Sequence, residues 1–174
     1  MIKRVLSLFL ILSLQLSAIE YKPTLLELEA KIFPKMILLN SKLDKTSETL
    51  TIYIIIKEWD IYTAQELQNN IENYYPKKIA GKKIVVSIEQ FKDFKKTPDA
   101  IILLKHTKEE LTQIANWANK KGIVSLAYDP SYMEYGILAS LYIGKSTKPY
   151  LNKKIIQKYG FEFNPQLLKL SKFK

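Results

Sequence analysis

The sequence predicts an α/β fold. We expect one domain with a mixed β-sheet flanked by helices in a Rossmann-like layout, ending in an antiparallel hairpin and a C-terminal helix. Short β-branched and apolar runs alternate with segments of helical period, and glycine or proline stands between them. The 174 residues suit a single domain with its own core, and no internal repeat or linker divides them.

The first eighteen residues are typical of a secretory signal peptide. Lys3 and Arg4 precede a twelve-residue apolar run, and Ala18 supplies a small residue at the cleavage point. An uncleaved anchor is the alternative, but a spanning helix needs about 20 apolar residues. The sequence therefore predicts a signal peptide over 1–18, a mature domain over 19–174 and a periplasmic location.

The first expected helix has one apolar face with a proline within it. The apolar positions at helical spacing are Leu25, Leu28, Ile32, Met36 and Leu39. Pro34 removes the bond to the carbonyl of Ala30, so we expect a kink or a break there.

The middle of the chain alternates strand and helix. Residues 50–56 and 83–88 read as strands, and Thr63 with Glu66 predicts a capping box for the helix between them. Residues 99–105 form a continuous apolar run, as expected of a strand that is covered on both faces.

A second capping box follows that run. Thr107 and Glu110 predict the start of a helix with Leu111, Ile114, Ala115 and Ala118 on its buried side, and Gly122 suits its C-terminal end.

The last third reads as strand, loop, hairpin and two helices. The expected elements are a strand over 122–128, a strand over 137–143, a turn over 144–147, a return strand over 149–152, a helix over 153–159 and a last helix capped by Asn164 and Pro165.

This succession resembles the C-terminal half of the YfiR-like periplasmic regulators. Residues 136–139 match a glycine motif, 149–152 match the end of the hairpin, and 164–170 match the closing motif. The motif residues are Asp129, Gly136, Asn152, Gln166, Leu167 and Leu168. Ala139 replaces a family glycine, Tyr150 replaces a glutamate, and the chain has no cysteine.

The resemblance implies a non-enzymatic periplasmic regulator. It would bind and repress the periplasmic sensor domain of an inner-membrane signalling protein, a diguanylate cyclase, and so act in c-di-GMP signalling and biofilm formation. A periplasmic small-molecule-binding protein that serves a transporter or a sensor kinase is the alternative. A homodimer is left open, and we expect no cofactor. Because cysteine is absent, thiol chemistry cannot switch the protein.

The residue inventory argues against catalysis. The single histidine, His106, lies at a strand–helix junction, where a surface role is more common than a catalytic one. One histidine without cysteine cannot supply a zinc site, and the five glycines are too far apart for a phosphate-binding loop. We therefore expect neither an enzyme nor a metal site.

The formal charge of +10 comes almost wholly from lysine, since the one arginine is Arg4 in the expected signal peptide. Bidentate recognition of guanine or phosphate depends on arginine, so nucleic acid is not the expected partner. The lysines read as a scattered, solvated surface, with a peripheral attraction to anionic lipid headgroups as the alternative.

A partner surface is expected in the loop after Asp129. The predicted contact residues are Tyr132, Met133, Tyr135 and Ile137. Aromatic residues and methionine are enriched at interfaces, and the loop is expected to be peripheral. The alternative is that this loop folds over the core, with Asn152 capping the next helix and Gln166 bonding the loop above it.

Overall fold

The computed structural model describes residues 21–91, 94 and 96–174. The predicted signal peptide over 1–18 lies outside the described residues. Within the described ranges, no helix combines the length and the apolar character that crossing a bilayer requires.

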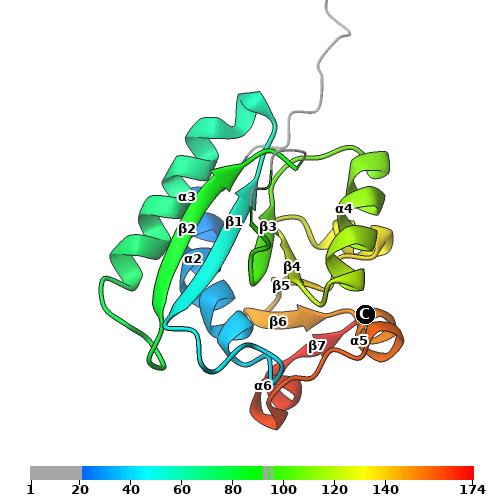
Figure 1. Ribbon diagram of the computed structural model, residues 1–174. Helices are drawn as coiled ribbons and strands as arrows, with labels where there is room; N and C mark the ends of the chain where they lie inside the picture. Colours follow the sequence, from blue (N-terminus) through cyan, green and yellow to red (C-terminus); the bar gives the residue numbers. More distant parts are fainter. Residues whose placement is uncertain (1–20, 92–93, 95) are drawn as a thin grey trace, which may run out of the picture.

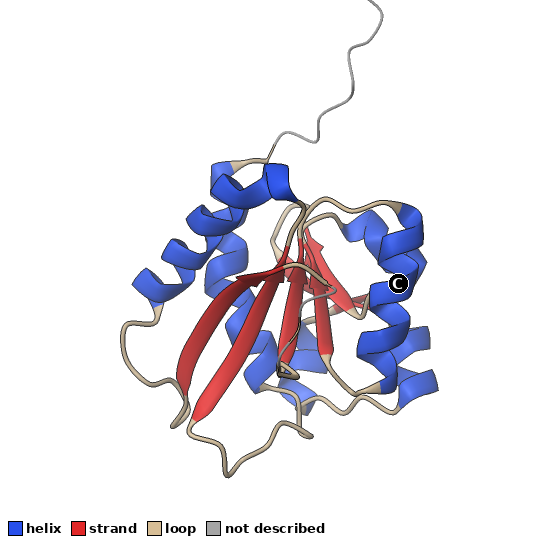
Figure 2. Cartoon of the chain, turned by 45° about the horizontal axis from the view of Figure 1, so that its top comes forward, coloured by secondary structure: helices blue, strands red, loops and turns tan. Residues whose placement is uncertain are grey.

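One seven-stranded sheet lies between helices (Figures 1 and 2). Its strand order is β2-β1-β3-β4-β5-β6-β7, and only the β5–β6 pair is antiparallel. The predicted α/β fold and its closing hairpin are therefore confirmed. The elements are α2 (Pro23–Leu38), β1 (Thr49–Ile55), the 3₁₀ turn η1 (Glu58–Asp60), α3 (Ile61–Tyr74), β2 (Lys83–Glu89), β3 (Ala100–Leu103), α4 (Lys108–Lys120), β4 (Val124–Ala127), the 3₁₀ helix η2 (Pro130–Tyr135), β5 (Ala139–Tyr142), β6 (Lys148–Leu151), α5 (Lys153–Tyr159), α6 (Pro165–Leu170) and β7 (Lys172–Phe173).

The sheet carries a separate apolar core on each face. In β1, Ile52 and Ile54 join the core built with α2 and α3, while Tyr53 and Ile55 join the core built with α4. Successive side chains of a strand point to opposite faces, so this alternation places α3 and α4 on opposite sides of the sheet. The chain adds β2 on one side of β1 and β3 on the other side. The topological switch point of the sheet therefore lies between β1 and β3.

The predicted apolar face of the first helix is confirmed except at Leu28. Met36 is buried in the core, and Leu25, Ile32 and Leu39 pack against it. The other buried apolar residues of α2 are Leu26, Ala30, Phe33 and Ile37. Leu28, which the periodicity placed inside, is 36% exposed. The helix also continues through Pro34 to Leu38, so the expected break is absent there; Pro34 itself is buried.

The buried face of α2 also includes a carboxylate. Glu29 is completely buried, and neither of its side-chain oxygens has a hydrogen-bond partner among the described residues. Burial raises the pKa of Glu29 well above its ordinary value, because the charged form cannot be solvated there.

The predicted capping box of Thr63 and Glu66 is wrong. The helix α3 begins at Ile61, directly after η1, so Asp60 occupies the N-cap position. Its side chain makes no capping bond; instead it accepts a hydrogen bond from the hydroxyl of Tyr21 at 3.0 Å.

Candidate functional site

The predicted contact residues lie mostly inside the molecule. Tyr132, Met133 and Ile137 are 7%, 2% and 0% exposed, and Tyr135 is half-buried. Tyr132 and Ile137 pack in the core under α4, because residues 130–135 fold back as η2. The expectation of a peripheral loop is therefore wrong, and these side chains do not form an exposed contact patch.

Three of the motif residues hold this region together. Asp129 accepts a hydrogen bond from Ser131 N at 2.8 Å and caps η2. Gly136 ends η2 at a φ of 96°, a conformation that glycine adopts without strain. Asn152 donates to the carbonyls of Met133 and Ile137 at 3.0 and 3.2 Å, and it caps α5. The alternative structural role of Asn152 is thus confirmed.

Two of the three closing-motif residues have a structural role, and the third is exposed. Leu167 is buried and Leu168 packs against the same core. Gln166 is exposed; its backbone N–H donates to Asn164 Oδ1 at 2.8 Å, and no side-chain hydrogen bond of Gln166 to the loop above is present in the described part of the chain.

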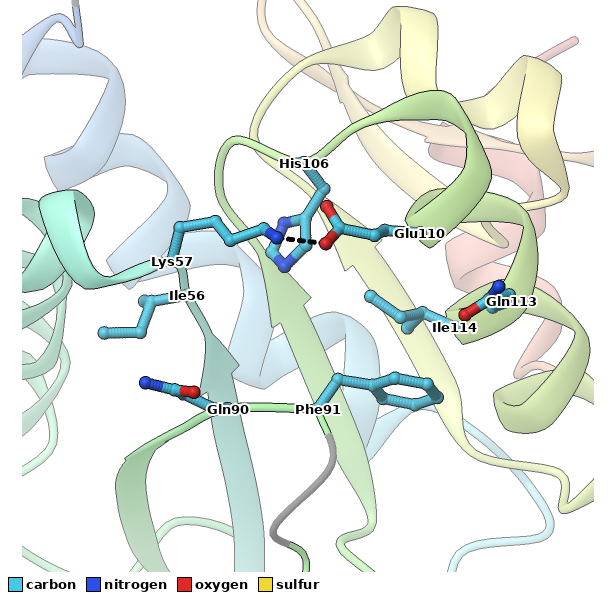
Figure 3. Close-up of a pocket in the computed structure, with 8 residues that line it drawn as sticks. All are labelled: Ile56, Lys57, Gln90, Phe91, His106, Glu110, Gln113 and Ile114. Atoms are coloured by element: carbon cyan, nitrogen blue, oxygen red, sulfur yellow. Dashed lines mark hydrogen bonds and ion pairs between the residues drawn. The ribbon is translucent and has the colours of Figure 1, made fainter.

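The candidate site is instead a cavity of about 200 Å³ at the switch point. The segments that follow β1, β2 and β3 meet the first two turns of α4 there (Figure 3). Ligands of open α/β sheets bind beyond the carboxyl ends of the strands at this point. The lining residues are Ile56, Lys57, Gln90, Phe91, His106, Glu110, Gln113 and Ile114.

An ion pair between Lys57 and Glu110 crosses the cavity (Figure 3). The other carboxylate oxygen of Glu110 accepts from Thr107 N at 3.1 Å, and Thr107 Oγ1 accepts from Glu110 N at 3.4 Å, so the predicted capping box is confirmed. Burial acts to raise the pKa of Glu110, but the hydrogen bonds from Lys57 and Thr107 outweigh it and lower that pKa. The Glu110 side chain is therefore an ionised, oriented acceptor.

His106 lies beside this pair (Figure 3). The expectation of a surface histidine is wrong, because its imidazole is half-buried and lines the cavity. Its Nδ1 lies 3.4 Å from the carbonyl oxygen of Leu104. Burial lowers the pKa of His106, so the ring is neutral at pH 7 and can exchange hydrogen bonds with a ligand.

Two tyrosines brace the loop that carries His106. Tyr132 accepts a hydrogen bond from the backbone N–H of His106 at 3.4 Å. Tyr21 accepts from Lys105 N at 2.9 Å while it donates to Asp60. This bracing gives Tyr132 a role in positioning the site, although its side chain is not exposed.

Apolar side chains form the remaining wall of the cavity. Ile114 is buried in the α4 core, and the ring of Phe91 packs edge-on against Trp117 with centroids 5.5 Å apart. An apolar wall opposite charged and amide groups suits a small ligand with a polar end. The cavity volume of about 200 Å³ suits a small ligand.

Within the described ranges, no group of three or more His, Cys, Asp or Glu side chains could hold a metal ion.

Sequence reasoning missed most of this site. Lys57, Gln90 and Phe91 stand next to strand ends, but only the strand order shows that these ends are neighbours.

Comparisons with known proteins give the fold and no family. No family model matches the chain, and no curated protein matches it. A conserved domain protein from Vibrio cholerae matches with a TM-score of 0.57 at 14% identity, over 86% of this chain. An ABC domain from Streptococcus pneumoniae, crystallised in complex with L-Trp, matches with a TM-score of 0.55 at 15% identity, over 80% of this chain. The chain spans 60% of the length of each of these two proteins.

Proposed function

We propose that this chain is a non-enzymatic binding protein whose switch-point cavity takes a small, partly apolar ligand with a hydrogen-bonding end. The observation that carries the proposal is the convergence of three strand ends on one cavity with an oriented ion pair, a neutral imidazole and an apolar wall. A fold shared with a domain bound to L-Trp supports a small molecule as the class of ligand.

The test is a thermal-shift screen of a panel of small polar metabolites, confirmed by calorimetry. A ligand present at 100 times its Kd stabilises by about 2.7 kcal/mol. For a protein of this size, that raises the Tm by roughly 5–10 °C.

Two tryptophan variants on α4 make the test specific to the cavity. Gln113 is exposed and lines the cavity, so Gln113→Trp should fill it and abolish the shift. Thr112 is exposed on the same helix and does not line it, so Thr112→Trp should keep the shift. A shift that survives Gln113→Trp, or a panel without any hit, would count against the proposal.

A second candidate function is repression of an inner-membrane signalling protein, a diguanylate cyclase or a sensor kinase. The resemblance of residues 129–170 to periplasmic regulators motivates it, and two exposed aromatic side chains favour it. Trp59 and Tyr62 are 68% and 82% exposed, and they follow β1 at the same edge as the cavity. Tryptophan and tyrosine are the residues that most often dominate binding energy at interfaces.

In this second function, Trp59 and Tyr62 replace the buried loop as the expected contact. The double variant Trp59→Ala, Tyr62→Ala should fold normally, since both side chains are exposed, and should raise the cyclic-dinucleotide level as far as deletion of the protein does. Unchanged cyclic-dinucleotide and kinase outputs in both strains would exclude the regulatory function and leave the ligand-binding proposal standing.

A further inference from the structure

The C-terminal part of the chain holds most of the excess positive charge. Residues 143–174 contain eight lysines and one acidic residue, so they account for seven of the ten net charges. In Figure 1, β6, β7, α5, α6 and the C-terminus lie together, away from α3 and β2. The net positive charge is therefore concentrated in this part of the molecule, because acidic residues are scarce there, while the lysines themselves occur along the whole chain.

Three of these lysines surround one hollow at the tip of the β5–β6 hairpin. The hollow measures about 470 Å³ and is lined by Tyr142, Lys145, Ser146, Lys148, Ser171 and Lys172, with no carboxylate among them. Lys145, Lys148 and Lys172 are exposed, and among the ion pairs of the described residues none involves them. Three unneutralised ammonium groups around one hollow attract anions.

The hairpin holds this arrangement through the ring of Tyr142. The ammonium of Lys172 lies 3.5 Å from the ring centroid, and the ring of Tyr150 lies 5.9 Å away. Gly144 allows the turn to approach the ring, because a Cβ there would lie 2.7 Å from Tyr142. The strand pairing of Tyr150 with Lys172 brings the C-terminal strand to the same place.

Two exposed aliphatic residues stand next to lining residues of the hollow in the chain. Ile143 follows Tyr142 and is 53% exposed, and Leu170 precedes Ser171 and is 65% exposed. A free phosphate or a nucleic acid would leave these side chains in water. A lipid surface would bury them at the boundary between headgroups and acyl chains while the lysines meet the headgroup phosphates.

We propose that the hairpin tip and the C-terminal strand form a docking surface for a membrane that contains anionic phospholipids. The lysines supply attraction to the headgroup phosphates, and Ile143 with Leu170 supplies shallow insertion. This surface is separate from the switch-point cavity, so neither activity depends on the other.

The test is co-sedimentation of the folded protein with vesicles of phosphatidylcholine containing about one third phosphatidylglycerol, and with pure phosphatidylcholine. Binding should need the anionic lipid. At about 1 kcal/mol for each lysine near such a surface, the triple variant K145Q/K148Q/K172Q should bind roughly 100-fold more weakly.

A charge-matched triple, K77Q/K96Q/K121Q, alters exposed lysines elsewhere and should retain most of the binding. The variant I143S/L170S keeps every charge and should lose roughly tenfold. Thermal melting of each variant confirms that it is folded.

Three results would overturn the proposal: equal losses in the two lysine triples, unchanged binding in I143S/L170S, or full competition by inorganic phosphate at constant ionic strength. A 20-base-pair DNA duplex serves as a further arm. Binding of the duplex more tightly than the vesicles, with loss in K145Q/K148Q/K172Q, would assign the surface to nucleic acid instead.

Discussion

Replacing Glu29 by methionine is expected to stabilise the protein. The Glu29 side chain is fully buried in α2 and has no hydrogen-bond partner for either oxygen in the described part of the chain. Methionine has a similar length and helix propensity, and its flexible thioether adapts to an irregular apolar site. The substitution therefore removes a desolvation cost without emptying the core.

The size of the effect follows from the cost of a buried, unsatisfied polar group. That cost is about 1–3 kcal/mol for a neutral group, and it grows when the group must ionise. We expect Glu29→Met to raise the free energy of unfolding by about 2 kcal/mol at pH 7. For a chain of this length, this corresponds to a Tm increase of roughly 4–8 °C.

The stability difference between Glu29→Met and the wild type should depend on pH. Burial raises the pKa of Glu29 in the folded state above its ordinary value of 4.5. At pH values between the ordinary pKa of the unfolded state and the raised pKa of the folded state, the folded protein binds more protons than the unfolded chain. Glu29 therefore makes the free energy of unfolding fall as the pH rises. The stability gap between Glu29→Met and the wild type should widen as the pH increases from 4 towards 8.

Urea unfolding at several pH values measures this gap. Glu27 is exposed on the same helix, so Glu27→Met should stay within about 0.5 kcal/mol of the wild type and serves as the control. A Glu29→Met protein that is less stable than the wild type, or a gap that does not change with pH, would refute the reasoning.

Three further predictions concern the region around the site. Asn152→Asp should lower the free energy of unfolding by about 2 kcal/mol in urea unfolding, because a carboxylate keeps the helix cap but cannot donate to the two carbonyls. A loss as small as that from the same substitution at an exposed asparagine would contradict this. Tyr132→Ala should lose roughly 3–5 kcal/mol as a core truncation, whereas a peripheral residue would lose almost nothing. Burial lowers the pKa of His106 in the folded state, so the free energy of unfolding should fall as the pH drops below 6.5. His106→Asn should flatten this part of the stability profile. An unaltered profile would show that His106 does not cause the fall.

Most of the fold was predictable because most of its elements carry a local signal. The apolar run at 99–105 predicts a strand, and the capping box of Thr107 and Glu110 predicts the start of a helix. The strand β3 and the helix α4 lie where these patterns indicate. The short strand β7 was not predicted, because two residues give no periodicity and β7 exists only through its pairing with β6.

The errors come from tertiary packing that local patterns do not encode. The periodicity of α2 placed Leu28 inside, but Leu28 is 36% exposed and the neighbouring Glu29 is buried. Tyr132 and Met133 were predicted as contact residues because aromatic residues and methionine in a loop are enriched at interfaces, but η2 folds them inward.

The candidate site depends on strand order, which the sequence does not state. Lys57, Gln90 and His106 are separated by up to 49 positions in the chain, and they meet only because β1 lies between β2 and β3. These three residues are too far apart in the chain to form a recognisable sequence motif. Glu110 gave no signal of a binding site, because its role in the helix cap already explained it.

An amide-resolved NMR titration tests the central claim, ligand binding at the switch point, most directly. ¹⁵N-labelled protein would be titrated with the strongest hit of the metabolite panel. We predict shifts that centre on residues 56–57, 90–91, 106 and 110–114 and that vanish in Gln113→Trp but persist in Thr112→Trp. Shifts confined to β6 and β7, or spread evenly over the chain, would contradict the account.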